Sequence, residues 1–180
     1  LGHAHLAITS ALDEHVQHGT AFFAPTELEI ELAELLRARL PSMQRVRFCS
    51  SGTEAVLNAL RAARAFTGRG HVAKFEGAYH GIGDPAMISY MPPVDASLGP
   101  AHRPHSVHSS AGLAPGTAES VVVLPFNDAD ACETILRDNA ADLAAVIIDP
   151  LSTATGLVLP QRAFLDRLRA VTRELGILLI

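Results

Sequence analysis

Residues 46–81 read VRFCSSGTEAVLNALRAARAFTGRGHVAKFEGAYHG, which places an apolar run, a helical segment and a second apolar run one after another. The helical segment spans about Thr53 to Phe66 and has apolar residues at three- and four-residue spacing. The runs on either side of it, Val46 to Cys49 and His71 to Phe75, have the length and composition of strands. This succession of strand, helix and strand predicts an α/β fold.

The same alternation continues along the rest of the chain. Further helical patterns are about Leu6 to Gln17, Thr26 to Leu40, Asp128 to Asn139 and Gln161 to Leu175. Further short apolar runs are Val121 to Leu124, Ala144 to Ile148 and Gly176 to Ile180. Most of these runs lack the alternation of a half-exposed strand, so we expect a mostly parallel sheet covered by helices on both faces. Two pairs have the spacing of a helix capping box, Thr26 with Glu29 and Ser51 with Glu54.

Composition narrows the class of protein. The 180 residues are 48% hydrophobic and 18% charged, which is typical of a globular chain. The formal net charge of −5 and the scattered basic residues disfavour nucleic-acid binding. With only two cysteines, Cys49 and Cys132, we expect an intracellular, cytoplasmic protein without a disulfide framework. No apolar stretch reaches the roughly 18 residues that a membrane-spanning helix needs.

Both ends of the sequence suggest a fragment. The chain opens at Leu1 without an initiator methionine, and it stops at Ile180 within a strand-like run. Buried strands of a parallel sheet normally continue into a turn and a helix. We therefore interpret residues 1–180 as part of one larger domain, truncated at both ends.

The turn Ser51-Gly52-Thr53 is the first candidate site. It lies between an apolar run and a helical segment, so its backbone amides converge at a helix N-terminus, where anions bind. Glycine permits close approach of a phosphate, and the hydroxyl groups add donors. The alternative is an ordinary capped helix in which Ser51 accepts a hydrogen bond from the Glu54 amide and no ligand binds. The turn matches neither a P-loop nor a dinucleotide fingerprint.

A second candidate site follows the run His71 to Phe75. Here Tyr79 and His80 lie between Gly77 and Gly81, where a flat ring could stack with the backbone close by. Together with the preceding turn, this segment suggests a phosphorylated aromatic cofactor. The alternatives are a packed core aromatic for Tyr79 and a structural, hydrogen-bonded role for His80.

Asp149 precedes Pro150 at the end of a buried run. A carboxylate at the C-terminal end of a parallel strand lies where α/β proteins place ligands. An aspartate before proline also commonly initiates a turn, and that alternative stays open.

The segment from Ile82 to Ser120 is rich in proline, glycine, serine and histidine and has no sustained period. A loop of this length in a compact domain is usually functional or mobile, so we expect a possible gate over the Tyr79-His80 segment. A disordered insertion is the alternative. His102, His105 and His108 have a spacing that could collect a metal ion, as in a metal-dependent hydrolase, although Pro104 opposes a helix there.

Taken in order, these motifs resemble the class III pyridoxal-phosphate (PLP) aminotransferases, and within them the glutamate-1-semialdehyde aminomutase-like members. The segments that carry the resemblance are Phe23 to Glu29, Ser51 to Ala55, Phe75 to Gly81 and Ile148 to Pro150. The resemblance covers essentially the whole chain. It implies part of the large domain of a fold-type I PLP-dependent transferase, acting on an amino acid or amino-aldehyde substrate.

The resemblance also implies roles for single residues. Ser51, Gly52 and Thr53 would hold the cofactor phosphate. Tyr79 would stack on the pyridine ring with His80 beside it. Asp149 would lie near the cofactor and substrate, where the family usually has glutamate, and the turn after it, residues 151–156, also departs from the family pattern. Relatives work as homodimers that share the active site.

Two residues of the family's catalytic machinery have no counterpart in this sequence. The aspartate that pairs with the pyridine nitrogen follows a strand resembling Gly176 to Ile180, and the Schiff-base lysine lies further downstream. Lys74, the only lysine of the chain, does not match that position. The 180 residues alone are therefore expected to be inactive, and a non-catalytic PLP-binding relative is the alternative.

Overall fold

The computed structural model describes residues 2–180 of the chain. By their internal contacts these residues divide into an N-terminal unit that ends at Phe48 and a C-terminal unit that begins at Cys49. Each unit is described by itself.

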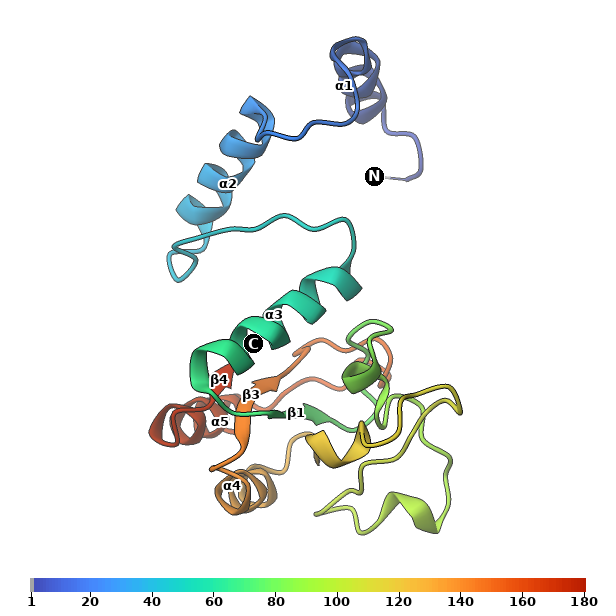
Figure 1. Ribbon diagram of the computed structural model, residues 1–180, viewed down its shortest axis with the longest axis vertical. Coiled ribbons are helices and arrows are strands. Elements are labelled where there is room, and N and C mark those ends of the chain that lie inside the picture. Colours follow the sequence, from blue (N-terminus) through green and yellow to red (C-terminus); the bar gives the residue numbers. More distant parts are fainter. Residues whose placement is uncertain (1) are drawn as a thin grey trace. The chain divides into compact units, whose positions relative to one another are not determined.

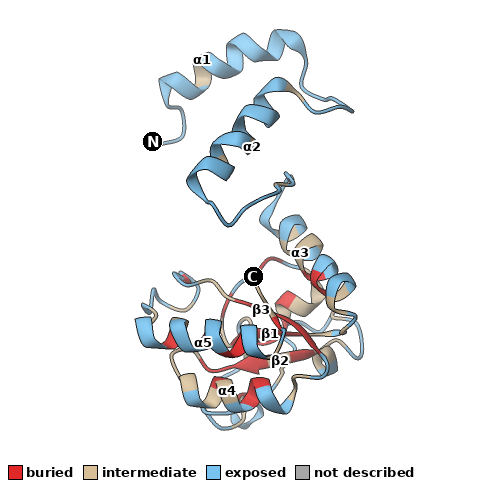
Figure 2. Cartoon of the chain, turned by 90° about the vertical axis from the view of Figure 1, so that its left-hand side faces the viewer, coloured by how far each residue is buried: buried red, intermediate tan, exposed pale blue. Residues whose placement is uncertain are grey.

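The N-terminal unit consists of helices without a buried core. Helix α1 spans Leu6–His15, a short 3-10 helix spans Val16–His18, and α2 spans Glu27–Arg39. The predicted capping box is confirmed, because Thr26 Oγ1 accepts from the Glu29 amide and the Glu29 carboxylate accepts from the Thr26 amide. None of residues 2–48 is buried (Figure 2). Both helices therefore present apolar side chains on an open surface.

The predicted strand Val46 to Cys49 is wrong. Residues 45–49 form neither helix nor strand. A strand is stabilised by the hydrogen bonds that it exchanges with a neighbouring strand. No segment among residues 2–180 pairs with this run, so its apolar composition alone does not produce a strand.

The C-terminal unit is built on a parallel sheet of four strands (Figure 1). The strands are β1 His71–Phe75, β2 Val121–Leu124, β3 Leu143–Ile147 and β4 Leu178–Leu179. Their order across the sheet is β2-β1-β3-β4. The predicted parallel sheet is confirmed: β1 and β2 have the predicted bounds, β3 lies one residue earlier, and β4 is shorter than its apolar run.

Helices cover both faces of this sheet. They are α3 Gly52–Thr67, α4 Ala129–Asp138 and α5 Arg162–Glu174. Helix α3 packs on one face, and α4 and α5 pack together on the other (Figure 1). Among residues 2–180, no helix combines the length and the apolar character needed to cross a bilayer.

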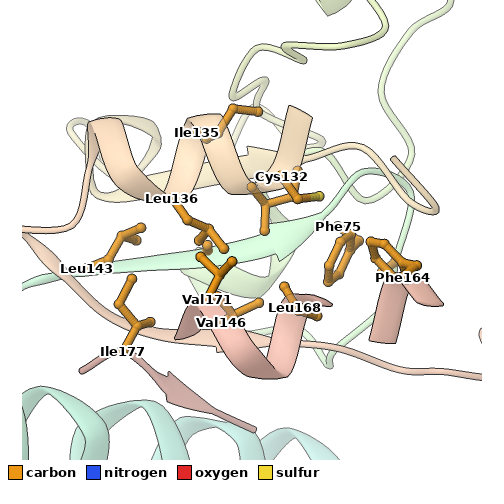
Figure 3. Packing of buried hydrophobic residues seen from close by; sticks show 13 residues of the cluster. Phe75, Cys132, Ile135, Leu136, Leu143, Val146, Phe164, Leu168, Val171 and Ile177 are labelled. Atoms are coloured by element: carbon orange, nitrogen blue, oxygen red, sulfur yellow. The ribbon is translucent and has the colours of Figure 1, made fainter. Parts of the chain in front are cut away.

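Alternate strand residues supply the two halves of the core. Ala73 and Phe75 of β1 face α4 and α5, where Phe75 packs edge-on against Phe164 with ring centroids 5.7 Å apart (Figure 3). Val72 of the same strand packs on the opposite side against Leu60 of α3. Burial on both faces explains why the strands have continuous apolar sequences.

The segment between β1 and β2, residues 76–120, forms the crossover that joins these two parallel strands. It contains short 3-10 helices at Asp84–Met87, Ala96–Leu98 and Ala118–Ser120. Ile88 is fully buried in the core beside α3, and it pairs with His108 in an isolated bridge. Part of the segment that the sequence predicts as a loop is therefore packed into the fold, while its action as a gate stays a prediction.

Candidate functional site

A hollow of about 400 Å³ lies at the C-terminal ends of β1 and β3, beside the start of α3. Its lining consists of Ser51, Gly52, Thr53, Val56, Tyr79, His80, Gly81 and Asp149. The structure thus brings together all six residues that the sequence nominates as a site. The carboxyl ends of strands are where open parallel sheets bind ligands.

The N-terminus of α3 forms one wall of the hollow. Ser51 Oγ accepts from the Glu54 amide at 3.2 Å, and the Glu54 carboxylate accepts from the Ser50 amide at 2.9 Å. The helix is therefore capped, although the reciprocal bond goes to the residue before the cap. Among residues 2–180, the amides of Gly52 and Thr53 have no acceptor. Capping and anion binding are compatible here, because the cap leaves these two donors free.

Gly81 brings the second motif against the first. A Cβ atom at Gly81 would lie 2.8 Å from Thr53 Cα, and the backbone there has a φ of +88°. The next residue adds a direct link, because the Ile82 amide donates to Thr53 Oγ1 at 3.2 Å. Only glycine combines this approach with this conformation. The contact fixes the turn that carries Tyr79 and His80 beside the start of α3.

Tyr79 presents its side chain to the hollow. It is 43% exposed, so the alternative of a packed core aromatic is wrong. Ala78, directly before it, is buried, which anchors the turn and leaves the neighbouring ring accessible. An exposed ring on a fixed turn suits stacking on a planar ligand.

His80 is the buried polar group of the hollow. The residue is only 8% exposed, and its Nε2 has no hydrogen-bond partner among residues 2–180. Burial lowers the pKa of His80 to about 4, and the nearby Lys74 ammonium acts in the same direction, while the Asp149 carboxylate opposes it. The imidazole is therefore neutral at pH 7, with one ring nitrogen available to a ligand or to another part of the protein.

His80 should make the fold sensitive to acid. The unfolded chain binds the proton at about pH 6.5 and the folded chain at about pH 4, so stability falls as the pH is lowered between these values. At about 1.4 kcal/mol per pKa unit, the loss approaches about 3 kcal/mol. Urea unfolding measured from pH 7 to pH 4 should show this loss. His80→Gln should abolish it, whereas the same change at the exposed His102 should retain it.

Asp149 both lines the hollow and initiates a turn. It follows β3 and lines the hollow, and its Oδ1 accepts from the Leu151 amide at 3.0 Å, which forms a tight turn. The turn continues to Ser152, whose carbonyl accepts from the Leu157 amide. Ser152 is buried, and its Oγ has no partner among the described residues. Residues 151–156 thus form an ordered turn beside the site.

Two residues of the lining were not nominated from the sequence. Val56 lies three residues after Thr53 on α3, so helical spacing places both residues on one face. This spacing could have predicted Val56 from the sequence. Gly81 belongs to the segment Phe75 to Gly81, but its contact with Thr53 depends on the fold. Lys74 does not line the hollow; it is 1% exposed, and its Nζ donates to the carbonyls of Ala86 and Ile88.

The three histidines of the crossover segment give no metal centre. Across the described residues 2–180, no three His, Cys, Asp or Glu side chains form a group that could hold a metal ion. His105 instead contacts the Ser97 carbonyl through its Nδ1 at 3.2 Å. The hydrolase alternative therefore has no support in the structure.

Known proteins resemble the chain along its full length. A curated relative, the glutamate-1-semialdehyde 2,1-aminomutase of Roseiflexus castenholzii, is 46% identical over 180 residues. An omega-transaminase from Sphaerobacter thermophilus is 46% identical with a TM-score of 0.92 over 98% of the chain, and a transaminase with PLP bound is 40% identical with a TM-score of 0.87. The chain spans 40% of the length of each of these three proteins.

The family prediction is confirmed by a direct match. The family model for class III aminotransferases covers residues 1–180. The fold class predicted from the alternation of strands and helices agrees with the structural likeness to transaminases. The chain belongs to the class III aminotransferase family.

Proposed function

We propose that this chain is the part of a PLP-dependent aminotransferase or aminomutase that binds the cofactor. One observation carries the proposal: two free amides, an exposed aromatic ring and an unpartnered buried imidazole surround the same hollow. Its volume of about 400 Å³ is in the range of small-molecule sites.

The residues present fit the chemistry of this cofactor. A phosphate dianion needs backbone donors at a helix N-terminus, and Gly52 and Thr53 supply them. A Cβ at Gly52 would meet nothing within 4 Å, so the turn is open where an anion would approach. A flat heteroaromatic ring needs an exposed aromatic face, which Tyr79 supplies.

Each residue would contribute binding or orientation. Gly52 and Thr53 would hold the phosphate, and Tyr79 would restrict the tilt of the ring. His80 would remain neutral and offer one ring nitrogen in a dry environment. Bound PLP supplies an electron sink for reactions at an amino group. Lys74 would not contact the cofactor, since it does not line the hollow and its ammonium donates to the backbone carbonyls of Ala86 and Ile88.

The proposed substrate is a small amino acid or amino-aldehyde. Relatives at the same 46% identity have different names, one an aminomutase and the other an omega-transaminase, so the class of amino substrate is proposed and not the individual reaction. We also propose that the protein is cytoplasmic and that it forms a homodimer with a shared active site. Exposed apolar side chains on α1 and α2 support a surface for the partner subunit. A monomeric mass of the complete gene product, measured by sedimentation at micromolar concentration, would contradict the homodimer.

Binding of PLP to site variants tests the cofactor proposal. In the complete gene product that contains this chain, Thr53→Val should weaken PLP about 10-fold, because it removes the hydroxyl that would donate to the phosphate and that also accepts from the Ile82 amide. Tyr79→Leu should weaken PLP by up to about 10-fold through loss of ring stacking. Absorbance titration of the cofactor measures both effects.

The control is Thr134→Val, at an exposed position on α4 where the hydroxyl contacts only its own helix. It should leave the affinity unchanged. If PLP binds the Thr53 and Tyr79 variants as tightly as the control, the assignment of the hollow fails.

A further inference from the structure

A second tyrosine lies against Tyr79. The ring centroids of Tyr79 and Tyr90 are 4.9 Å apart, and their planes are inclined by 53°. Aromatic pairs at this separation attract each other beyond the effect of burial alone. Tyr79 lines the hollow and Tyr90 does not. Tyr90 therefore supports the ring of Tyr79 from outside the lining.

The backbone beside Tyr90 is held in an unusual conformation. Ser89 has a φ of +49°, which residues other than glycine rarely adopt, and it is completely buried. Its amide donates to the Val107 carbonyl at 2.7 Å, and its carbonyl accepts from the Gly77 amide at 2.8 Å. Its hydroxyl donates to the His105 carbonyl and accepts from the Val107 amide. These bonds link the crossover segment directly to the turn that carries Tyr79.

Further bonds fix both sides of Ser89. The Lys74 ammonium donates to the carbonyls of Ala86 and Ile88 at 2.9 and 2.5 Å. On the other side, Ser109 Oγ accepts from the Tyr90 amide at 2.9 Å. The backbone that carries Tyr90 is thus set by β1, by the Gly77 turn and by residues 105–109.

We propose that Tyr90 is a positioning residue: it holds the ring of Tyr79 in the orientation that stacks on a planar heteroaromatic ligand. This inference rests on the proposed function and adds a residue to it. A ring that is already oriented loses less conformational freedom when the ligand binds. Nothing in the local sequence signals this role, since Tyr90 lies in a segment without periodicity.

The test compares two ligands in the complete gene product. Tyr90→Leu keeps an apolar side chain of useful size but removes the ring pair, and Tyr90→Phe restores it. Tyr90→Leu should weaken PLP between about 2-fold and 10-fold, and Tyr90→Phe should bind PLP as the wild type does. Inorganic phosphate, measured by calorimetry, should bind all three proteins equally, because it has no ring. Met91→Ala, at the exposed neighbouring residue, should change neither affinity.

Each outcome decides the proposal. Equal PLP affinity for wild type and Tyr90→Leu overturns it, and so does an equal loss of PLP and phosphate, which would indicate general damage to the fold. A Tyr90→Phe variant as weak as Tyr90→Leu also overturns it. If the wild type binds neither ligand, the proposed function itself fails, and that result is distinct from wild-type binding that is insensitive to Tyr90.

Discussion

Replacing Gly81 with alanine is expected to lower the free energy of unfolding by about 3 kcal/mol or more. The added Cβ would lie 2.6 Å from Thr53 Oγ1 and 2.8 Å from Thr53 Cα. The backbone at Gly81 also has a φ of +88°, which is strained for any side chain. Relief of the overlap requires the Tyr79-His80 turn to move away from α3. We therefore also expect PLP binding to weaken more than 10-fold, since the turn and the helix form one site.

Gly68→Ala is the matched control for this prediction. Gly68 has a similar φ of +71°, but a Cβ there would meet nothing within 4 Å. It should cost only about 1 kcal/mol, from the conformation alone. Urea unfolding of both variants separates the steric contribution from the conformational one. Equal losses would show that the contact between Gly81 and Thr53 relaxes without cost.

Local sequence predicts the elements whose stability is decided locally. Helix α3 has an apolar stripe and a serine cap, and Gly68 ends it in a left-handed conformation. Strands β1 and β2 are uninterrupted apolar runs with both faces buried, so their bounds follow from composition. Residues 46–49 have the same composition as a strand, but a strand also needs a partner, and composition does not supply one.

The site is predictable to the same extent. The turn Ser51 to Thr53 lies at the start of α3, and α3 leads directly into β1. Tyr79 and His80 follow β1. The two motifs are therefore close in sequence and are joined by a single helix and strand. Asp149 is predictable because the C-terminal end of a parallel strand is a common place for ligands in α/β folds. Contacts that cross the fold leave no such signal. The approach of Gly81 to Thr53 and the pairing of Tyr90 with Tyr79 became visible only in the structure.

The burial of Lys74 is also not predictable from the local sequence, and it has a large expected effect on the pH dependence of stability. The sequence around Lys74 correctly predicts a strand. It does not predict that the ammonium is buried. Burial lowers the pKa of Lys74 to about 8. Between pH 8 and pH 10.5 the unfolded chain keeps the proton and the folded chain releases it, so folding becomes more favourable as the pH rises. The gain is about 3 kcal/mol.

Lys74→Met removes this titration and keeps the volume of the side chain. At pH 7 two effects oppose each other: methionine avoids the cost of a buried charge, but it leaves the carbonyls of Ala86 and Ile88 without their donor. The free energy of unfolding of the wild type minus that of the variant should therefore be small at pH 7. This difference should increase by about 3 kcal/mol by pH 10.5.

The same substitution should change the site without touching its lining. The Lys74 ammonium is one cause of the low pKa of His80, so removal of its charge should raise that pKa, as measured by NMR of the imidazole. Burial is the larger cause and is unaffected, so the pKa of His80 should stay below its usual range. If Lys74→Met leaves the pKa of His80 unchanged and the relative stability flat from pH 7 to pH 10.5, Lys74 is not the buried cation beneath this site. A higher pKa of His80 in the variant, together with a relative stability that grows from pH 7 to pH 10.5, would show that Lys74 is a buried cation that helps to keep His80 neutral.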